Sequence, residues 1–299
     1  YVLPKASVYA GGNLHYVFYP NVRNTDGSQA FTLIPCETFG PSSLEFLVTE
    51  QGGGVNGSKL GIFWYSPAAK TLTKRFVNVG RYDQPDSTKQ AGTTKVIDSG
   101  DTGIQNAIFR SGRIYTCHTA KVGTFKAAAV YYVLNTSGFA VEMDMAVGNS
   151  TGYFTYPEVM VDATGRLATV WSYCDTSHFA GSAYTVSGNT APPYKFRDSL
   201  YLRSGLSTYT QFRWGDYNGV ALDPGNPRMV WFSGMYVRGN HTWGTRIGAV
   251  VTPNSPTTSD QLLGAAVNLP DAEGNTALHR ARSHTHTHTH THTHTRKRK

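Results

Sequence analysis

Seven polar residues share a position at or just before the start of an apolar segment: Asp101, Asn106, Tyr156, Glu158, Arg213, Asp216 and Tyr217. In a hydrolase of sugars, one carboxyl group acts as the general acid and a second acts as the base or nucleophile. A tyrosine is the alternative nucleophile. The catalytic candidates are therefore Asp101, Glu158, Asp216 and Tyr217.

The same residues also have a structural interpretation. Arg213 can hold an anionic group through its planar guanidinium, or it can pair with Asp216 three residues later. The Asp216 carboxylate can also accept backbone N–H groups at the junction between two repeating units. Both interpretations stay open at the level of sequence.

The ligand-binding candidates are Asn106, His118, Tyr156, Arg213, Trp214 and Trp243. His118 falls one strand further along and either faces a ligand or hydrogen-bonds to a neighbouring unit. Trp214 and Trp243 each precede a glycine, which suits an exposed loop ring that stacks on a sugar, although packing under a loop remains the alternative. Trp171 lies in the middle of an apolar segment and is expected in the core.

The elements that position these residues repeat along the chain. Four stretches, at about residues 31–79, 106–147, 156–203 and 217–251, each contain apolar segments separated by turns marked with Gly or Asp. Repeats of this length and content predict an all-β fold, a β-propeller of four-stranded blades. Residues 8–19 look like the closing strands of a blade whose start is missing, so the ring is expected to be incomplete. Ligands of propellers usually sit where the inner strands and their loops meet.

Composition agrees with this fold and argues against a membrane-spanning or nucleic-acid-binding protein. Charged residues make up 15% of the 299 residues, aromatic residues 12%, and there are 31 glycines, which suits short strands and tight turns. No apolar run is long enough for a membrane span. The net charge of +8 permits affinity for anionic glycans or surfaces, but the basic residues follow no pattern typical of nucleic-acid binding.

Neither a metal site nor a cofactor is predicted. Cys36, Cys117 and Cys174 have no Cys-x-x-Cys spacing and are interpreted as small buried side chains. Four N-x-S/T sequons, which begin at Asn56, Asn135, Asn149 and Asn240, give weak support for secretion.

The chain changes character at Pro253, which divides it into a propeller domain, 1–252, and a tail, 253–299. Residues 266–281 resemble the opening of an ankyrin repeat, with Ala277 where proline is usual. A strict His-Thr alternation from His284 to Thr295 and a basic end follow. We interpret this end as a low-complexity tail, and metal chelation by its histidines is the alternative.

Several motifs carry a resemblance to a known family. They are Tyr82-Asp-Gln-Pro-Asp-Ser-Thr-Lys-Gln, Ile97-Asp-Ser-Gly-Asp-Thr-Gly-Ile-Gln-Asn-Ala, Arg113-Ile-Tyr-Thr-Cys-His-Thr, Tyr153-Phe-Thr-Tyr-Pro-Glu-Val-Met-Val-Asp, Arg213-Trp-Gly-Asp-Tyr and Trp243-Gly-Thr-Arg-Ile-Gly. Through these six motifs, residues 1–251 resemble secreted β-propeller proteins related to the sialidase (BNR-repeat) superfamily. The resemblance implies a propeller, export from the cell and a surface or polysaccharide setting. It does not bring a sialidase active site, because no Asp-box stands intact and no three arginines match that family's carboxylate-binding triad.

We therefore expect a secreted or cell-surface propeller that binds a glycan or a cell-surface protein, without nucleic acid or cofactor. A sialidase-like glycoside hydrolase or a polysaccharide lyase is one alternative. A structural or adhesive module of a larger surface protein is another.

Overall fold

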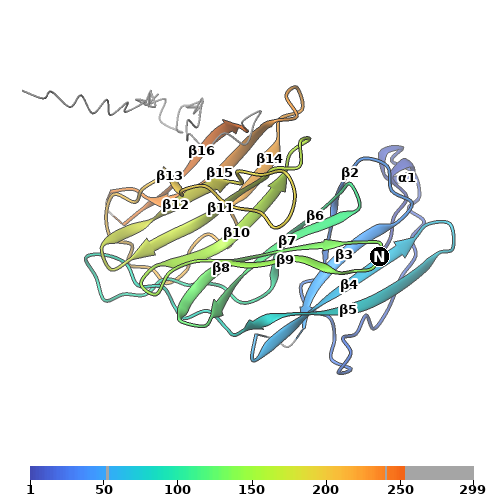
Figure 1. Ribbon diagram of the computed structural model, residues 1–299, viewed down its shortest axis with the longest axis horizontal. Coiled ribbons are helices and arrows are strands. Elements are labelled where there is room, and N and C mark those ends of the chain that lie inside the picture. The colour runs from blue at the N-terminus through green and yellow to red at the C-terminus, as the bar shows by residue number, and fades with distance from the viewer. Residues whose placement is uncertain (52–53, 240, 253–299) are drawn as a thin grey trace, which may run out of the picture.

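The computed structural model describes residues 1–51, 54–239 and 241–252, and in these the fold is all-β apart from the five-residue helix α1 (Lys5–Tyr9). The strands form four successive antiparallel units (Figure 1). The first unit contains β1 (Ile34–Pro35), β3 (Glu45–Gln51), β4 (Gly57–Ser66) and β5 (Thr71–Tyr82). The second contains β6 (Ile104–Arg110), β7 (Arg113–Val122), β8 (Phe125–Asn135) and β9 (Val141–Val147). Each unit thus has the up-and-down strand order of a propeller blade.

The third unit contains β10 (Tyr153–Val161), β11 (Leu167–Asp175), β12 (His178–Val186) and β13 (Leu200–Arg203), and the fourth contains β14 (Gly219–Leu222), β15 (Met229–Val237) and β16 (Trp243–Val251). A parallel bridge between Tyr153 and Ala127 connects the second and third units, and β2 (Glu37–Phe39) runs parallel to β6. The described part of the fourth unit has three strands.

The strand ends follow the turn residues of the sequence. Ser111 and Gly112 connect β6 to β7 and both have positive φ, 51° and 76°. This backbone is typical of a two-residue hairpin loop, because its twist matches the twist of the paired strands. The carboxylate of Asp162 accepts hydrogen bonds from the backbone N–H groups of Thr164 and Arg166 and so closes the turn between β10 and β11. Both turns contain the Gly or Asp residues that the sequence predicts between apolar segments.

Apolar side chains fill the space between neighbouring units. Val48, Ile62 and Ile114 are fully buried between the first and second units. Trp171 and Val133 are fully buried in the cluster that joins the later units. The first and fourth units lie at opposite ends of the row, and no strand pairing joins them within the described residues (Figure 1).

The prediction for the first thirty residues is wrong. They contain α1 and two isolated bridges, Val2 with Val17 and Arg23 with Gln29, but no longer strand. The Tyr1 ring stacks on Phe18 and packs edge-on against Tyr16, and all three rings stay exposed. A strand needs a continuous paired neighbour, and this segment has only the two isolated bridges.

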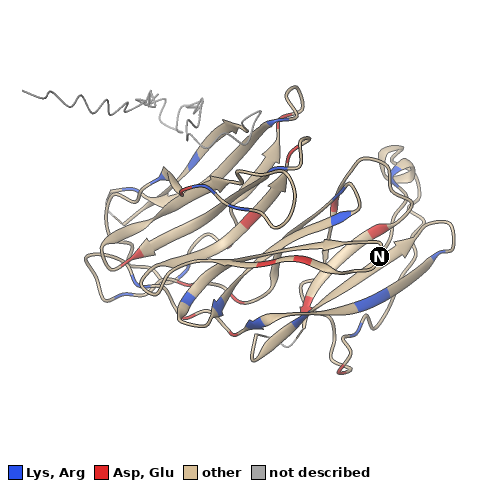
Figure 2. Cartoon of the chain, viewed as in Figure 1, with Lys and Arg blue, Asp and Glu red and all other residues tan. Residues whose placement is uncertain are grey.

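Other expectations have a mixed outcome. All three cysteines are free and buried, as expected. No described helix is long and apolar enough to cross a membrane. The predicted tail, including its ankyrin-like segment and His-Thr alternation, lies outside the described residues. Lys and Arg residues are spread over several strands and loops (Figure 2).

Candidate functional site

Strand β10 contains a bulge. The pairing of β10 with β11 shifts between Thr155 and Glu158, and within this shift Tyr156 has a φ of 53°. A bulky residue rarely adopts this left-handed backbone, and such strain persists only where the surroundings enforce it.

Three segments enforce the conformation of Tyr156. Its backbone N–H donates to the Thr119 hydroxyl on β7 at 2.8 Å, and its carbonyl accepts from the Asn218 amide just before β14 at 2.7 Å. Gly100, with a φ of 72°, lies so close that a Cβ atom there would be 2.8 Å from Cε1 of the Tyr156 ring. Tyr156 is therefore fixed by neighbouring units on both sides and by a loop.

The Tyr156 hydroxyl group is buried among charged side chains. Arg213 donates to Asp98 at 2.8 Å and to Asp216 at 2.5 Å. These residues and Asp101 all act electrostatically on the Tyr156 hydroxyl. We call Asp98, Asp101, Tyr156, Arg213 and Asp216 the Tyr156 cluster.

Several polar atoms at this cluster have no partner. The Tyr156 hydroxyl oxygen, Oδ1 of Asp216 and Oδ1 of Asn218 are buried without a hydrogen bond to any described residue. Burial, followed by the charges of Asp98 and Asp216, raises the pKa of Tyr156 above its usual value, while Arg213 lowers it. The hydroxyl therefore stays protonated at neutral pH and is a hydrogen-bond donor, not a phenolate nucleophile.

The loops that carry the cluster hold each other in place. The Gln90 side chain exchanges two hydrogen bonds, of 2.6 and 2.9 Å, with the backbone of Tyr209. The backbone N–H of Asp98 donates to the carbonyl of Phe212 at 2.9 Å. Trp214 donates from Nε1 to Ser172 at 3.2 Å and packs edge-on against Tyr209. The loops 83–103 and 204–218 thus form one preorganised edge beside Tyr156.

Two aromatic rings and a small cavity adjoin the cluster. Phe212 and Tyr217, the neighbours of Arg213 and Asp216, are 54% and 70% exposed. Asp98, Ser172 and Trp214 are among the residues that line a cavity with room for about one water molecule. The edge therefore presents polar groups next to exposed rings.

The structure brings together four residues singled out in the sequence: Asp101, Tyr156, Arg213 and Asp216. The ion pair between Arg213 and Asp216 is the arrangement that the structural interpretation predicted. Oδ1 of Asp101 accepts from the backbone N–H of Gly103 at 2.7 Å.

Glu158 has a different environment, although it is only two residues from Tyr156. Its charge acts on Cys117 and Tyr131, which belong to the core cluster that joins the later units. Burial raises the pKa of Glu158 to about 8. Asn106 joins β6 to β10, because its amide donates to the carbonyl of Val159 at 2.8 Å and accepts from the Val159 N–H at 3.2 Å.

His118 is completely buried. Its Nδ1 lies 2.7 Å from the Thr102 carbonyl and its Nε2 lies 3.1 Å from the Tyr132 hydroxyl. Burial lowers the pKa of His118 to about 4, so the ring is neutral at pH 7. Tyr132 belongs to the same unit as His118 and Thr102 lies just before that unit, so the prediction of a hydrogen bond to a neighbouring unit is wrong, and the ring does not face a ligand either.

The two tryptophans differ. Trp214 follows the alternative in which it packs under a loop, because it shares a buried cluster with Ile97 of the loop 83–103 and is only 5% exposed. Trp243 begins β16 and is 57% exposed, as expected for a ring that can stack on a sugar.

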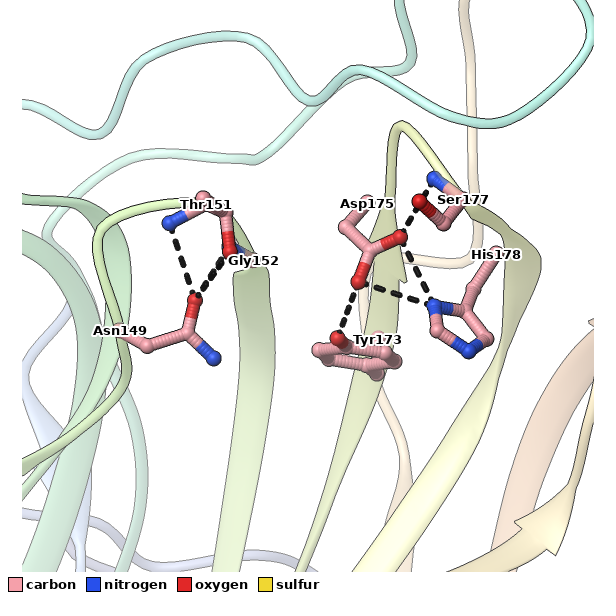
Figure 3. A network of polar contacts seen from close by, with 7 residues as sticks. All are labelled: Asn149, Thr151, Gly152, Tyr173, Asp175, Ser177 and His178. Atoms are coloured by element: carbon pink, nitrogen blue, oxygen red, sulfur yellow. Dashed lines mark hydrogen bonds and ion pairs between the residues drawn. The ribbon is translucent and has the colours of Figure 1, made fainter.

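Sequence reasoning did not single out two groups of residues. Asp98 lies within one of the motifs that carry the family resemblance and Asn218 directly follows another, which was the available signal. The second group surrounds Asp175 at the hairpin between β11 and β12 (Figure 3). The described residues contain no group of His, Cys, Asp and Glu able to hold a metal ion.

Comparison with known proteins gives only distant similarities. No family model matches the chain, and no curated protein does. An endo-arabinase from Bacteroides thetaiotaomicron is similar in structure, with 9% identity and a TM-score of 0.42 over 81% of this chain and 86% of that one. An α-L-arabinanase from Penicillium chrysogenum has 12% identity and a TM-score of 0.34 over 74% of this chain and 75% of that one.

An ulvan lyase bound to a saccharide is also similar, with 12% identity and a TM-score of 0.40 over 74% of this chain and 53% of that one. At these identities and TM-scores, the similarities carry no argument about a ligand or a reaction. The sialidase resemblance and the ankyrin resemblance have no counterpart among the matches described.

Proposed function

We propose that this protein binds a carbohydrate at the Tyr156 cluster and acts outside the cell. The observation that carries the proposal is the Tyr156 hydroxyl, which is buried, unpaired and held at a strained backbone conformation among three carboxylates and an arginine. A buried hydroxyl without a partner is unfavourable, so its retention suggests a role for it in binding.

The chemistry of the site suits a ligand rich in hydroxyl groups. Tyr156 and Arg213 donate hydrogen bonds, whereas Asp98 and Asp216 accept them. Phe212 and Tyr217 add exposed rings on which a sugar can stack. Since Arg213 is already paired with two carboxylates, a neutral sugar fits better than an acidic one.

A panel of neutral and carboxylated oligosaccharides tests the proposal by calorimetry. We expect a neutral oligosaccharide to bind and Asp216→Asn to weaken it about tenfold or more, since hydrogen bonds to charged groups are the stronger ones. Asp223→Asn is the matched control, because Asp223 only closes the turn before β15 and supports Trp231. Equal affinities in the two variants would argue against the site.

A glycoside hydrolase, or a polysaccharide lyase, is the second candidate. The observation in its favour is that two carboxylates, those of Asp98 and Asp216, are both held by Arg213 beside the Tyr156 hydroxyl, as a pair of acidic groups in one site. Release of shorter or unsaturated products from the panel, lost in Asp216→Asn while folding is intact, would favour an enzyme. Binding without products would support a binding protein. If there is neither binding nor product, a structural or adhesive module is favoured.

A further inference from the structure

The hairpin between β11 and β12 carries a second group of polar contacts, made by residues other than those of the Tyr156 cluster (Figure 3). Nδ1 of His178 lies 2.8 Å and 2.9 Å from the two carboxylate oxygens of Asp175. The Tyr173 hydroxyl donates to the same carboxylate at 2.5 Å, and the backbone N–H of Ser177 donates at 2.7 Å.

These contacts fix the tautomer of His178. Because a carboxylate only accepts hydrogen bonds, Nδ1 must carry the proton, and in the neutral ring Nε2 is then an acceptor. Nε2 has no hydrogen bond to any residue in the part of the chain that the structure describes, and the His178 side chain is 52% exposed. The imidazole is thus oriented at one nitrogen and available at the other.

The arrangement exceeds what the turn requires. The Ser177 N–H bonded to Asp175 is sufficient for a turn of this kind. Tyr173 and His178 add contacts that hold Asp175 and aim the imidazole. Burial acts to raise the pKa of Asp175, but the hydrogen bonds from Tyr173, His178 and Ser177 outweigh it and lower that pKa. The carboxylate is therefore a stable support for His178.

Aromatic rings border the available nitrogen. The Tyr201 ring on β13 lies 6.2 Å from the His178 ring and 5.9 Å from the Tyr173 ring, measured between centroids. Tyr201 is 44% exposed, whereas the hydroxyl of Tyr173 is already bonded to Asp175. Tyr201 therefore places a large, partly exposed ring beside the His178 ring.

We propose that Tyr201 and His178 form a second, separate saccharide site, in which a neutral sugar stacks on the Tyr201 ring and one of its hydroxyls donates to Nε2 of His178. An apolar ring face next to one well-oriented acceptor is the combination that a sugar recognises, since its C–H face is apolar and its rim carries hydroxyls. The site uses no residue of the Tyr156 cluster and does not depend on the function proposed for that cluster.

The test is nuclear magnetic resonance of the full-length protein labelled with 15N-histidine, and the probes are cellotetraose, xylotetraose, mannotetraose and arabinotetraose. His178→Asn identifies the His178 signals, and its amide can still donate to Asp175 while it lacks Nε2. We expect at least one probe to shift the Nε2 signal saturably, with millimolar affinity.

Three further variants show whether the shift of the Nε2 signal arises from binding at Tyr201 and His178. Tyr201→Leu should weaken the binding about tenfold, because it removes the stacking ring. Asp216→Asn should leave this shift unchanged, which separates the second site from the Tyr156 cluster. His15→Asn, at an exposed histidine far from the hairpin in sequence, is the control for nonspecific effects.

Two results would overturn the proposal. One is the absence of a saturable Nε2 shift with all four probes at about 10 mM, a concentration well matched to millimolar binding. The other is an equal shift in the Tyr201→Leu variant with its melting temperature retained. Either result would leave Asp175, Tyr173 and His178 as a support for the hairpin alone.

Discussion

At the scale of single residues, Tyr156 and Glu158 show how one bulge separates two side chains that are close in sequence. Tyr156 turns toward the loops and the charged cluster, whereas the Glu158 carboxyl lies in the core near Cys117 and Tyr131. The sequence predicted both as residues at the start of one strand. It could not predict their separation, because the shift in pairing between Thr155 and Glu158 depends on the partner strand.

Glu158 should make the stability of the protein depend on pH. Its pKa is raised from an ordinary value of 4.5 to about 8, so its ionisation disfavours the folded state as the pH rises from 4.5 through 8. We expect Glu158→Gln to stabilise the protein by up to about 5 kcal/mol at pH 9 and by much less at pH 5. Urea unfolding at both pH values measures this difference.

The control for this prediction is Glu142→Gln. Glu142 accepts a hydrogen bond from Arg113 at the edge of the second unit, so the substitution removes a favourable contact. It should not stabilise the protein at either pH. A Glu158→Gln variant whose stabilisation is equal at pH 5 and pH 9 would show that the burial of this carboxyl is not the cause.

At the scale of elements, the site depends on contacts between loops far apart in the chain. Gln90 binds the backbone of Tyr209, and Asp98 pairs with Arg213. The units and most of their turns were predictable, because strand alternation and turn residues are local signals. The burial of Trp214 was not, since it depends on a loop more than a hundred residues earlier in the chain.

Gly100 tests this loop contact. Gly100 and Gly112 both have positive φ, 72° and 76°, but a Cβ atom at Gly112 would meet nothing within 4 Å. Gly112→Ala should cost about 1 kcal/mol from its backbone alone. Gly100→Ala should cost roughly 1–3 kcal/mol more and weaken saccharide binding, because the new methyl group displaces the Tyr156 ring. Thermal melts measure the loss of stability and calorimetry measures the loss of saccharide affinity. Equal losses in the two variants would show that a methyl group at residue 100 does not crowd the Tyr156 ring.

At the scale of the whole molecule, four successive units pack side by side and the last described residues close the fourth. Thr252 hydrogen-bonds to Asp162 and to the carbonyl of Arg228, so the chain is still anchored there. The periodicity of the sequence predicted this row of units. It did not predict the irregular first thirty residues, because aromatic alternation resembles a strand even where no partner strand exists.

The boundary near Pro253 remains a prediction. Limited proteolysis should remove the residues after 252 without changing the melting temperature of the remainder, because the third strand of the fourth unit runs to Val251 and Thr252 is anchored to Asp162. The cleaved and intact proteins should therefore melt within about 1 °C of each other. A drop of several degrees after cleavage would place the boundary elsewhere.

The proposal that the Tyr156 hydroxyl binds a saccharide is tested most sharply by two variants, Tyr156→Phe and Tyr131→Phe. Their melting temperatures and saccharide affinities are compared. Both hydroxyls are buried, but that of Tyr131 accepts a hydrogen bond from Thr169 at 2.5 Å, whereas that of Tyr156 has no partner among the described residues. Loss of the Tyr131 hydroxyl should destabilise the protein by about 1 kcal/mol and leave binding intact.

Loss of the Tyr156 hydroxyl should leave stability unchanged or raise it by about 1–3 kcal/mol, while saccharide affinity falls at least about tenfold. That opposite behaviour is the result expected of a hydroxyl group kept for a ligand. The contrary result is a Tyr156→Phe variant that lowers the melting temperature as Tyr131→Phe does and binds the oligosaccharide as tightly as the parent protein. The Tyr156 cluster would then be a structural junction and not a saccharide site.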